Sequence, residues 1–102
     1  MMLAKRKRLV DPAAIEAAGK PYCEVCGQSA HGGPHHIITV GAGGPDHKYN
    51  LIQLCGICHY AKIPSGKLTR RFLFGIVARR EGATVEEVEE TVCRLKNHYS
   101  PV

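Results

Sequence analysis

Four of the five cysteines form two pairs with the spacing of metal-binding knuckles. Cys23 and Cys26 make one CxxC pair, and Cys55 and Cys58 make a second. Two thiols with two residues between them can both reach one ion, and two such turns supply four thiolates, the usual shell of structural Zn²⁺. Four unrelated thiols, or a redox-active CxxC pair, are less consistent with two matched pairs in one small chain. We therefore predict a structural zinc ion on these four cysteines.

The segment between the two knuckles is rich in histidine and suits a second, more open metal site. It contains His31, His35, His36 and His47. A further histidine, His59, directly follows Cys58 of the second knuckle. A zinc ion held by four thiolates is coordinatively closed and cannot carry out chemistry itself. A lone histidine is usually a satisfied surface or core residue, but an adjacent pair beside a rigid zinc shell indicates a candidate site for a divalent ion.

The whole chain has 102 residues and a net charge of +5, from 14 Lys and Arg against 9 Asp and Glu. This length predicts a single domain over 1–102 with a thin core, of a size that often needs a metal or a disulfide to stabilise it. The basic excess favours a polyanionic partner, nucleic acid before membrane. No apolar run approaches the roughly 18 residues of a membrane span. The basic start lacks the apolar stretch of a secretory signal. We therefore expect a cytoplasmic protein, in a compartment where paired cysteines are metal ligands.

Charge is distributed unevenly along the sequence. Residues 1–10 form a basic arm, whose run Lys5–Arg8 is either a solvated terminus or a segment that grips a nucleic-acid backbone. Residues 47–80 contain seven basic residues and no acid, whereas 81–90 contain five acids and no base. The middle third is therefore the expected anion-facing part, and the acidic run is the expected outer face of a helix.

The elements before Pro64 are predicted to be short. Asp11 and Pro12, followed by an alanine-rich stretch and Gly19, predict a short N-terminal helix, since Asp suits an N-cap and Pro the first helical position. We expect three further elements: strands over 36–40 and 49–55, and one or two helical turns over 58–63.

Two helices are predicted over 65–97. Ser65 is the expected cap of the first, over 66–80, and Gly82 its end. Its expected apolar face consists of Leu68, Phe72, Leu73, Ile76 and Val77. Phe74 falls on the opposite face, where it either stacks on a base or packs on a neighbouring element. Thr84 and Glu87 match a capping box that opens the last helix, in which Cys93 is expected to be buried.

A gapped motif carries a family resemblance. It runs His35-His36-Ile37-Ile38, Gly43-Gly44, Asn50-Leu51-Ile52 and Leu54-Cys55-Gly56-Ile57-Cys58-His59. This pattern resembles the HNH endonuclease family, of the small stand-alone phage or prophage type with a four-cysteine zinc site. The resemblance covers about 23–62 and implies a ββα-metal finger, in which two short strands and a helix grip one divalent ion. We therefore expect a small α+β zinc-stapled domain, with the finger over 20–63 between the knuckles and helices on either side.

The resemblance also implies a role for each matched residue. His35 and His59 are the implied ligands of the catalytic ion, and His36 is the implied base that deprotonates the attacking water. Asn50 is expected to orient His36 by hydrogen bonding. Some relatives have a further histidine where this chain has Ile63, so the ion would have two protein ligands. Two imidazoles favour a transition ion such as Mn²⁺, Co²⁺ or Ni²⁺ over Mg²⁺, and Mn²⁺ is our first expectation.

The predicted function is therefore that of a metal-dependent DNA endonuclease in a bacterial or phage-infected cell. A monomer with one active site is expected to nick one strand, with low sequence specificity. The candidate phosphate contacts are Lys48, Lys62, Lys67, Arg70 and Arg71. Two alternatives are an inert zinc-ribbon module that binds nucleic acid, and a zinc-stapled module that binds protein through its acidic helix. Neither explains the intact set of His35, His36, Asn50 and His59.

Overall fold

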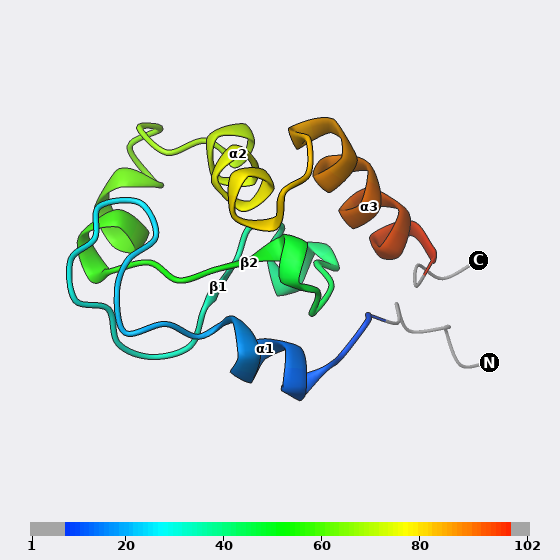
Figure 1. The fold of residues 1–102 in the computed structure, drawn as a ribbon, viewed down its shortest axis with the longest axis horizontal. Coiled ribbons are helices and arrows are strands. Elements are labelled where there is room, and N and C mark those ends of the chain that lie inside the picture. The colour runs from blue at the N-terminus through cyan, green and yellow to red at the C-terminus, as the bar shows by residue number, and fades with distance from the viewer. Residues whose placement is uncertain (1–7, 99–102) are drawn as a thin grey trace.

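The computed structural model describes residues 8–98 of this small α+β chain (Figure 1). Lys5–Lys7 of the basic arm lie outside the described residues, so only Arg8 of that run can be placed. The elements, in order, are α1 (Pro12–Ala18), β1 (His35–His36), the short helix η1 (Val40–Ala42), the short helix η2 (Lys48–Asn50), β2 (Leu51–Ile52), the π-helix η3 (Cys58–Lys62), α2 (Arg70–Glu81) and α3 (Val85–His98). None of the helices within the described residues is long and apolar enough to cross a membrane.

The sheet consists of β1 and β2, which pair antiparallel with His35 opposite Ile52 and His36 opposite Leu51. Both predicted strands, over 36–40 and 49–55, are therefore wrong in extent. β1 ends early because the Thr39 hydroxyl accepts a hydrogen bond from the Ala42 amide and starts η1. On the other side, η2 occupies the residues just before β2. Short helices that begin and end on local caps thus replace most of the expected ladder.

The predicted N-terminal helix is confirmed as α1. The Asp11 side chain accepts a hydrogen bond from the Ala14 amide at 3.3 Å, and Pro12 occupies the first turn. The Gly19 amide donates to the carbonyl of Glu16 and ends the helix. These are local signals that act within a few residues, which is why the sequence pattern identified them.

The predicted start of α2 at residue 66 is wrong, since the helix begins at Arg70. Thr69 is its cap, with the hydroxyl accepting from the Phe72 amide at 3.1 Å. The hydroxyl of Ser65, the expected cap, instead donates to a carbonyl of the preceding turn at 3.0 Å. The end is as predicted, at Gly82, whose left-handed conformation (φ +69°) is one that glycine adopts readily.

The buried face of α2 also differs from the prediction. Its buried residues are Leu73, Phe74, Val77 and Ala78. Phe74 is 3% exposed, whereas Phe72 is 51% exposed. Phe74 therefore packs in the core and is not available to stack on a base. The buried positions are spaced three and four apart, which defines one stripe of a helix, and Phe72 lies outside that stripe.

The predicted capping box at the start of α3 is confirmed. The Thr84 amide donates to Glu87 Oε1 at 3.3 Å, and the Glu87 amide donates to Thr84 Oγ1 at 3.1 Å. Val88 and Val92 are fully buried. The prediction that Cys93 is buried is wrong, because this thiol is exposed. It follows Val92 by one residue and so lies about 100° further around the helix.

One continuous core joins the knuckles to the C-terminal helices. The cluster of buried side chains includes Cys58 of the second knuckle, Ile52 of β2, Val77 of α2 and Val92 of α3. Figure 1 shows α2 lying beside α3 on one side of the short sheet, with α1 on the other. The finger segment and the helices after it therefore share the same buried surface.

Candidate metal and catalytic site

The four paired cysteines come together, as predicted. Their Sγ atoms all lie within 4.8 Å of one another, and those of Cys26 and Cys55 are 3.6 Å apart. Zn–S bonds of about 2.3 Å place the sulfurs of a tetrahedral site roughly 3.8 Å apart. Cys23, Cys55 and Cys58 are buried and Cys26 is exposed. The donor set and its spacing therefore fit a structural zinc ion.

Backbone hydrogen bonds shape both knuckles. In the first, the Gly27 amide donates to the Cys23 carbonyl at 2.9 Å, and the Cys23 amide donates to the Gln28 carbonyl at 2.7 Å. Gly27 has a φ of +79°, which a residue with a Cβ rarely adopts. In the second, the His59 amide donates to the Cys55 carbonyl at 2.9 Å. This last bond fixes His59 to the metal-binding turn.

The thiols of the cluster influence one another strongly. Burial, followed by the neighbouring thiols, raises the pKa of Cys58 to about 12. Burial acts in the same direction on Cys23, but backbone hydrogen bonds outweigh it and lower the pKa of that thiol to about 6. Several thiolates at one buried point repel each other unless a cation is bound. The cluster is therefore built for a positively charged ion.

The predicted histidines meet in a cavity beside the second knuckle. The rings of His35, from β1, and His59, from η3, have centroids 4.7 Å apart. Both residues line an open cavity of about 440 Å³, and His36 lines it too. Burial, together with the charges of His59 and His36, lowers the pKa of His35 to about 4. His35 is therefore neutral at physiological pH, the state in which an imidazole binds a metal.

The expected hydrogen bond from Asn50 to His36 is not the one that forms. Asn50 is fully buried, and its Oδ1 accepts from the Ile38 amide at 2.8 Å. Its Nδ2 donates to the carbonyls of Ile38 at 3.0 Å and Pro45 at 3.1 Å. These three bonds use both N–H groups and the oxygen of the amide, so Asn50 holds the loop between β1 and β2 closed. His36 is bonded elsewhere.

The partner of His36 is Asp46, a residue that lies outside the segments of the gapped motif. Asp46 Oδ1 lies 2.8 Å from His36 Nε2 and also contacts the Arg8 guanidinium, while Oδ2 accepts from the Asp11 amide at 2.9 Å. Burial alone would raise the pKa of Asp46, but these hydrogen bonds outweigh it and hold that pKa below its usual value. One signal was available in the sequence: Asp46 is the only acidic residue in the stretch 25–80.

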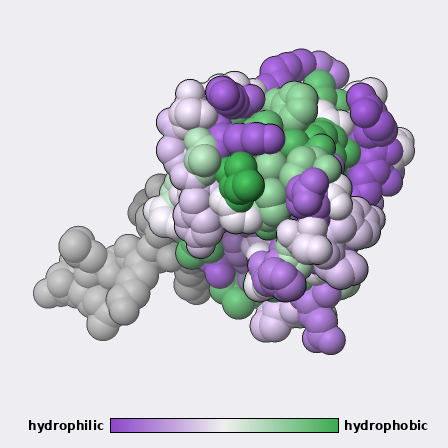
Figure 2. Space-filling view, turned by 90° about the vertical axis from the view of Figure 1, so that its left-hand side faces the viewer, coloured by the Kyte–Doolittle hydropathy of each residue, from purple (hydrophilic) through white to green (hydrophobic). Residues whose placement is uncertain are grey.

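The candidate phosphate contacts divide into two groups. Lys48 pairs with Glu81 at 3.4 Å, and Arg71 pairs with Glu86 and Glu89 at 2.8 Å each. Three of the candidates form no ion pair with any described residue: Lys62, Lys67 and Arg70. Figure 2 shows the knuckle end of the molecule, where hydrophilic side chains border an apolar patch. Cationic side chains that form no ion pair with a described residue therefore lie on both η3 and α2, where an anionic partner could bind.

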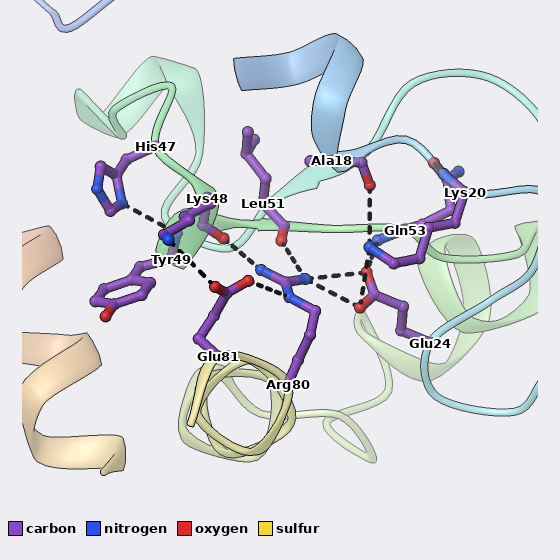
Figure 3. Close-up of polar contacts among 10 residues, drawn as sticks. All are labelled: Ala18, Lys20, Glu24, His47, Lys48, Tyr49, Leu51, Gln53, Arg80 and Glu81. Carbon is purple, nitrogen blue, oxygen red and sulfur yellow. Dashed lines mark hydrogen bonds and ion pairs between the residues drawn. The ribbon is translucent and has the colours of Figure 1, made fainter. Parts of the chain in front are cut away.

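Arg80 of α2 fastens the C-terminal helices to the finger segment (Figure 3). Its Nη1 donates to Glu24 Oε1 at 2.9 Å and to the Leu51 carbonyl at 3.1 Å. Its Nη2 donates to the Lys48 carbonyl at 2.6 Å, and its Nε donates to Glu81 Oε2 at 2.8 Å. Glu24 lies between the two cysteines of the first knuckle, so this one side chain connects a helix, a strand and a metal-binding turn.

Comparison with known proteins shows a similarity over part of the chain. A scan against protein-family models matches residues 23–64 to the HNH endonuclease family. The match spans both knuckles, both strands and η3, together with His35, His36, Asn50 and His59. Searches of curated proteins and of solved structures gave no match. HNH domains are in general metal-dependent nucleases, and residues 23–64 of this chain match the model of that domain.

Proposed function

We propose that this chain is a divalent-metal-dependent DNA endonuclease that nicks one strand of duplex DNA with low sequence specificity. The observation that carries the proposal is the convergence of His35, His36 and His59 on one open cavity beside the zinc knuckle. In this assignment β1, β2 and η3 are the strands and the helix of a ββα-metal finger. The four-cysteine cluster is its structural support.

In the proposed reaction, His36 accepts the proton of the attacking water. Its Nε2 is engaged by Asp46, which leaves Nδ1 as the basic nitrogen. His35 and His59 are the residues that would hold the catalytic ion, and a divalent ion bound there would supply Lewis-acid stabilisation of the developing negative charge. Asn50 contributes by holding the loop that follows His36. Because two imidazoles suit transition metals, we propose Mn²⁺, with Co²⁺ or Ni²⁺ next and Mg²⁺ less effective.

DNA is proposed to bind through its phosphate backbone. Lys62, Lys67 and Arg70 are the better candidates, since Lys48 and Arg71 would first have to leave their acidic partners. Contacts to phosphate carry no sequence information, which is the basis for proposing low specificity. One active site per monomer is the basis for proposing a nick rather than a double-strand cut.

The test is cleavage of supercoiled plasmid by zinc-loaded protein, with Mn²⁺, Co²⁺, Ni²⁺ or Mg²⁺ added, beside a His36→Ala variant of equal zinc content. We expect ion-dependent open-circle product from the wild type. The nicking rate of the variant should be lower by about 10²- to 10⁴-fold, the usual contribution of a general base to the rate. DNA binding is measured in parallel at two salt concentrations, since phosphate contacts weaken as salt rises. Absence of cleavage with every ion, combined with retained binding, would replace the nuclease by an inert nucleic-acid-binding module.

A further inference from the structure

We propose that Asp46 is a positioning residue of this site, which fixes the His36 ring in the tautomer protonated at Nε2 and so presents Nδ1 as the basic nitrogen. This inference rests on the proposed role of His36 as the base. It assigns to Asp46 the orienting task that the family resemblance implied for Asn50.

The position of the Asp46 carboxylate is fixed from several sides. The residue is 1% exposed. Its Oδ2 accepts from the Asp11 amide at 2.9 Å, and its own amide donates to the Leu9 carbonyl at 2.9 Å. Arg8 contacts Oδ1 and also donates to the Gly44 carbonyl at 3.1 Å. A carboxylate held in this way presents Oδ1 to the His36 ring as a hydrogen-bond acceptor in a fixed position.

The direction of the hydrogen bond between Asp46 and His36 follows from the charges. An ionised carboxylate only accepts hydrogen bonds, and the adjacent Arg8 guanidinium favours the ionised form of Asp46. The 2.8 Å contact therefore has His36 Nε2 as the donor. A neutral imidazole that donates from Nε2 has its lone pair on Nδ1, so the partner selects the tautomer.

No other described side chain makes a hydrogen bond to the His36 ring that would set its orientation. Asn50, the expected partner, instead bonds the backbone of Ile38 and Pro45. Asn50 contributes indirectly, because its bond to the Pro45 carbonyl holds the residue just before Asp46. The Asn50 amide thus fixes the loop, and the Asp46 carboxylate fixes the ring of His36.

The test compares Asp46→Asn, His36→Ala and the double variant in plasmid nicking, at matched zinc content and with varied DNA concentration. An orienting role predicts that Asp46→Asn lowers kcat by about 100-fold, within the range known for loss of general-base function, and changes KM little. It also predicts that Asp46→Asn causes no further loss in the His36→Ala background, because Asp46 acts only through His36. A matched control is Asp11→Asn, which alters a neighbouring carboxyl that caps α1 and forms no hydrogen bond with the His36 ring.

A second readout needs no activity: the tautomer of His36 in ¹⁵N-resolved NMR spectra of the zinc-loaded protein. The inference predicts a proton on Nε2 in the wild type and a changed ring signal in Asp46→Asn. An Nδ1-protonated ring in the wild type overturns it, even if the variant fails to fold. Full activity of Asp46→Asn beside an inactive His36→Ala, or additive losses in the double variant, also overturn it while leaving the nuclease intact. An inactive wild type instead overturns the proposed function.

Discussion

At the scale of single residues, the site depends on the close packing of Gly44 against the Ile38 carbonyl in the loop after β1. A Cβ added at Gly44 would lie 1.8 Å from the Ile38 carbonyl oxygen and 2.9 Å from Asn50 Nδ2. Both atoms belong to the hydrogen bond by which Asn50 closes the loop. Side-chain volume at this position is therefore incompatible with the closed loop.

Gly44→Ala is expected to open the loop and to lower the free energy of unfolding by about 1–3 kcal/mol, through loss of the buried Asn50 hydrogen bond. The nicking rate should fall as well, because Asp46 lies two residues beyond. The matched control is Gly41→Ala, where an added Cβ meets nothing within 4 Å. Thermal unfolding and plasmid nicking check both variants, and equal melting temperatures for the two would contradict the interpretation.

The sequence predicted which histidines meet, but it did not predict what orients them. The positions of these histidines follow from motif spacing. His35 and His36 form β1, and His59 directly follows Cys58 of the second knuckle. Asp46 reaches His36 only because the loop folds back along Arg8, a residue 38 positions away from Asp46. Such a contact depends on the path of the whole loop, and no local pattern in the sequence specifies that path.

At the scale of elements, the important connection is the one that Arg80 makes from α2 to Glu24, Leu51 and Lys48. Arg80 and Glu24 are 18% and 6% exposed at their side chains, so this ion pair is largely shielded from water. Glu24 also accepts from the Gln53 amide at 2.7 Å (Figure 3). The first knuckle is thus fixed to β2 both directly and through α2.

Arg80→Gln is expected to lower the free energy of unfolding by about 2–3 kcal/mol, because Glu24 would remain largely buried without its main cationic partner. Thermal unfolding of the zinc-loaded protein measures this, and zinc affinity from competition with a chelator should weaken with it. The neighbouring Arg79→Gln is the matched control, since Arg79 makes no ion pair within residues 8–98. A similar melting temperature for the two variants would show that Arg80 does not fasten the helices to the finger.

The elements that were predictable from sequence are those with local end signals. The Asp11 cap, Gly82 and the Thr84–Glu87 box each act within about one helical turn. The start of α2 was not predictable in this way, because both Ser65 and Thr69 can cap a helix. Which of them does so depends on the fold around them.

At the scale of the whole molecule, metal binding and folding are linked. Three of the four clustered cysteines, Cys23, Cys55 and Cys58, belong to the same buried core as the helical valines, and the core of so small a chain is thin. The free energy of zinc binding is therefore part of the folding free energy. The fifth cysteine, Cys93, is exposed and lies outside the cluster, which makes it a reference thiol.

Removal of zinc with an excess of chelator is expected to abolish most of the native circular dichroism of the finger segment. A thiol reagent should modify one cysteine in the zinc-loaded wild type and five after chelation, because zinc-bound thiolates are protected. The control is Cys93→Ser, which should show no rapid modification in the zinc-loaded form. Retained native dichroism with zinc shown to be absent would refute the linkage.

The contacts of Arg8 and Arg80 set the practical boundaries of the proposed nuclease when it is moved into another protein. The segment that matches the family covers residues 23–64, yet the carboxylate beside His36 is held by Arg8, and the first knuckle is held by Arg80. A fusion that joined only the matched segment to a foreign DNA-binding protein would lose Arg8, which holds the carboxylate beside His36, and Arg80, which holds the first knuckle. A portable cutting module has to extend at least from Arg8 through the helices after the finger, so linkers belong outside those limits.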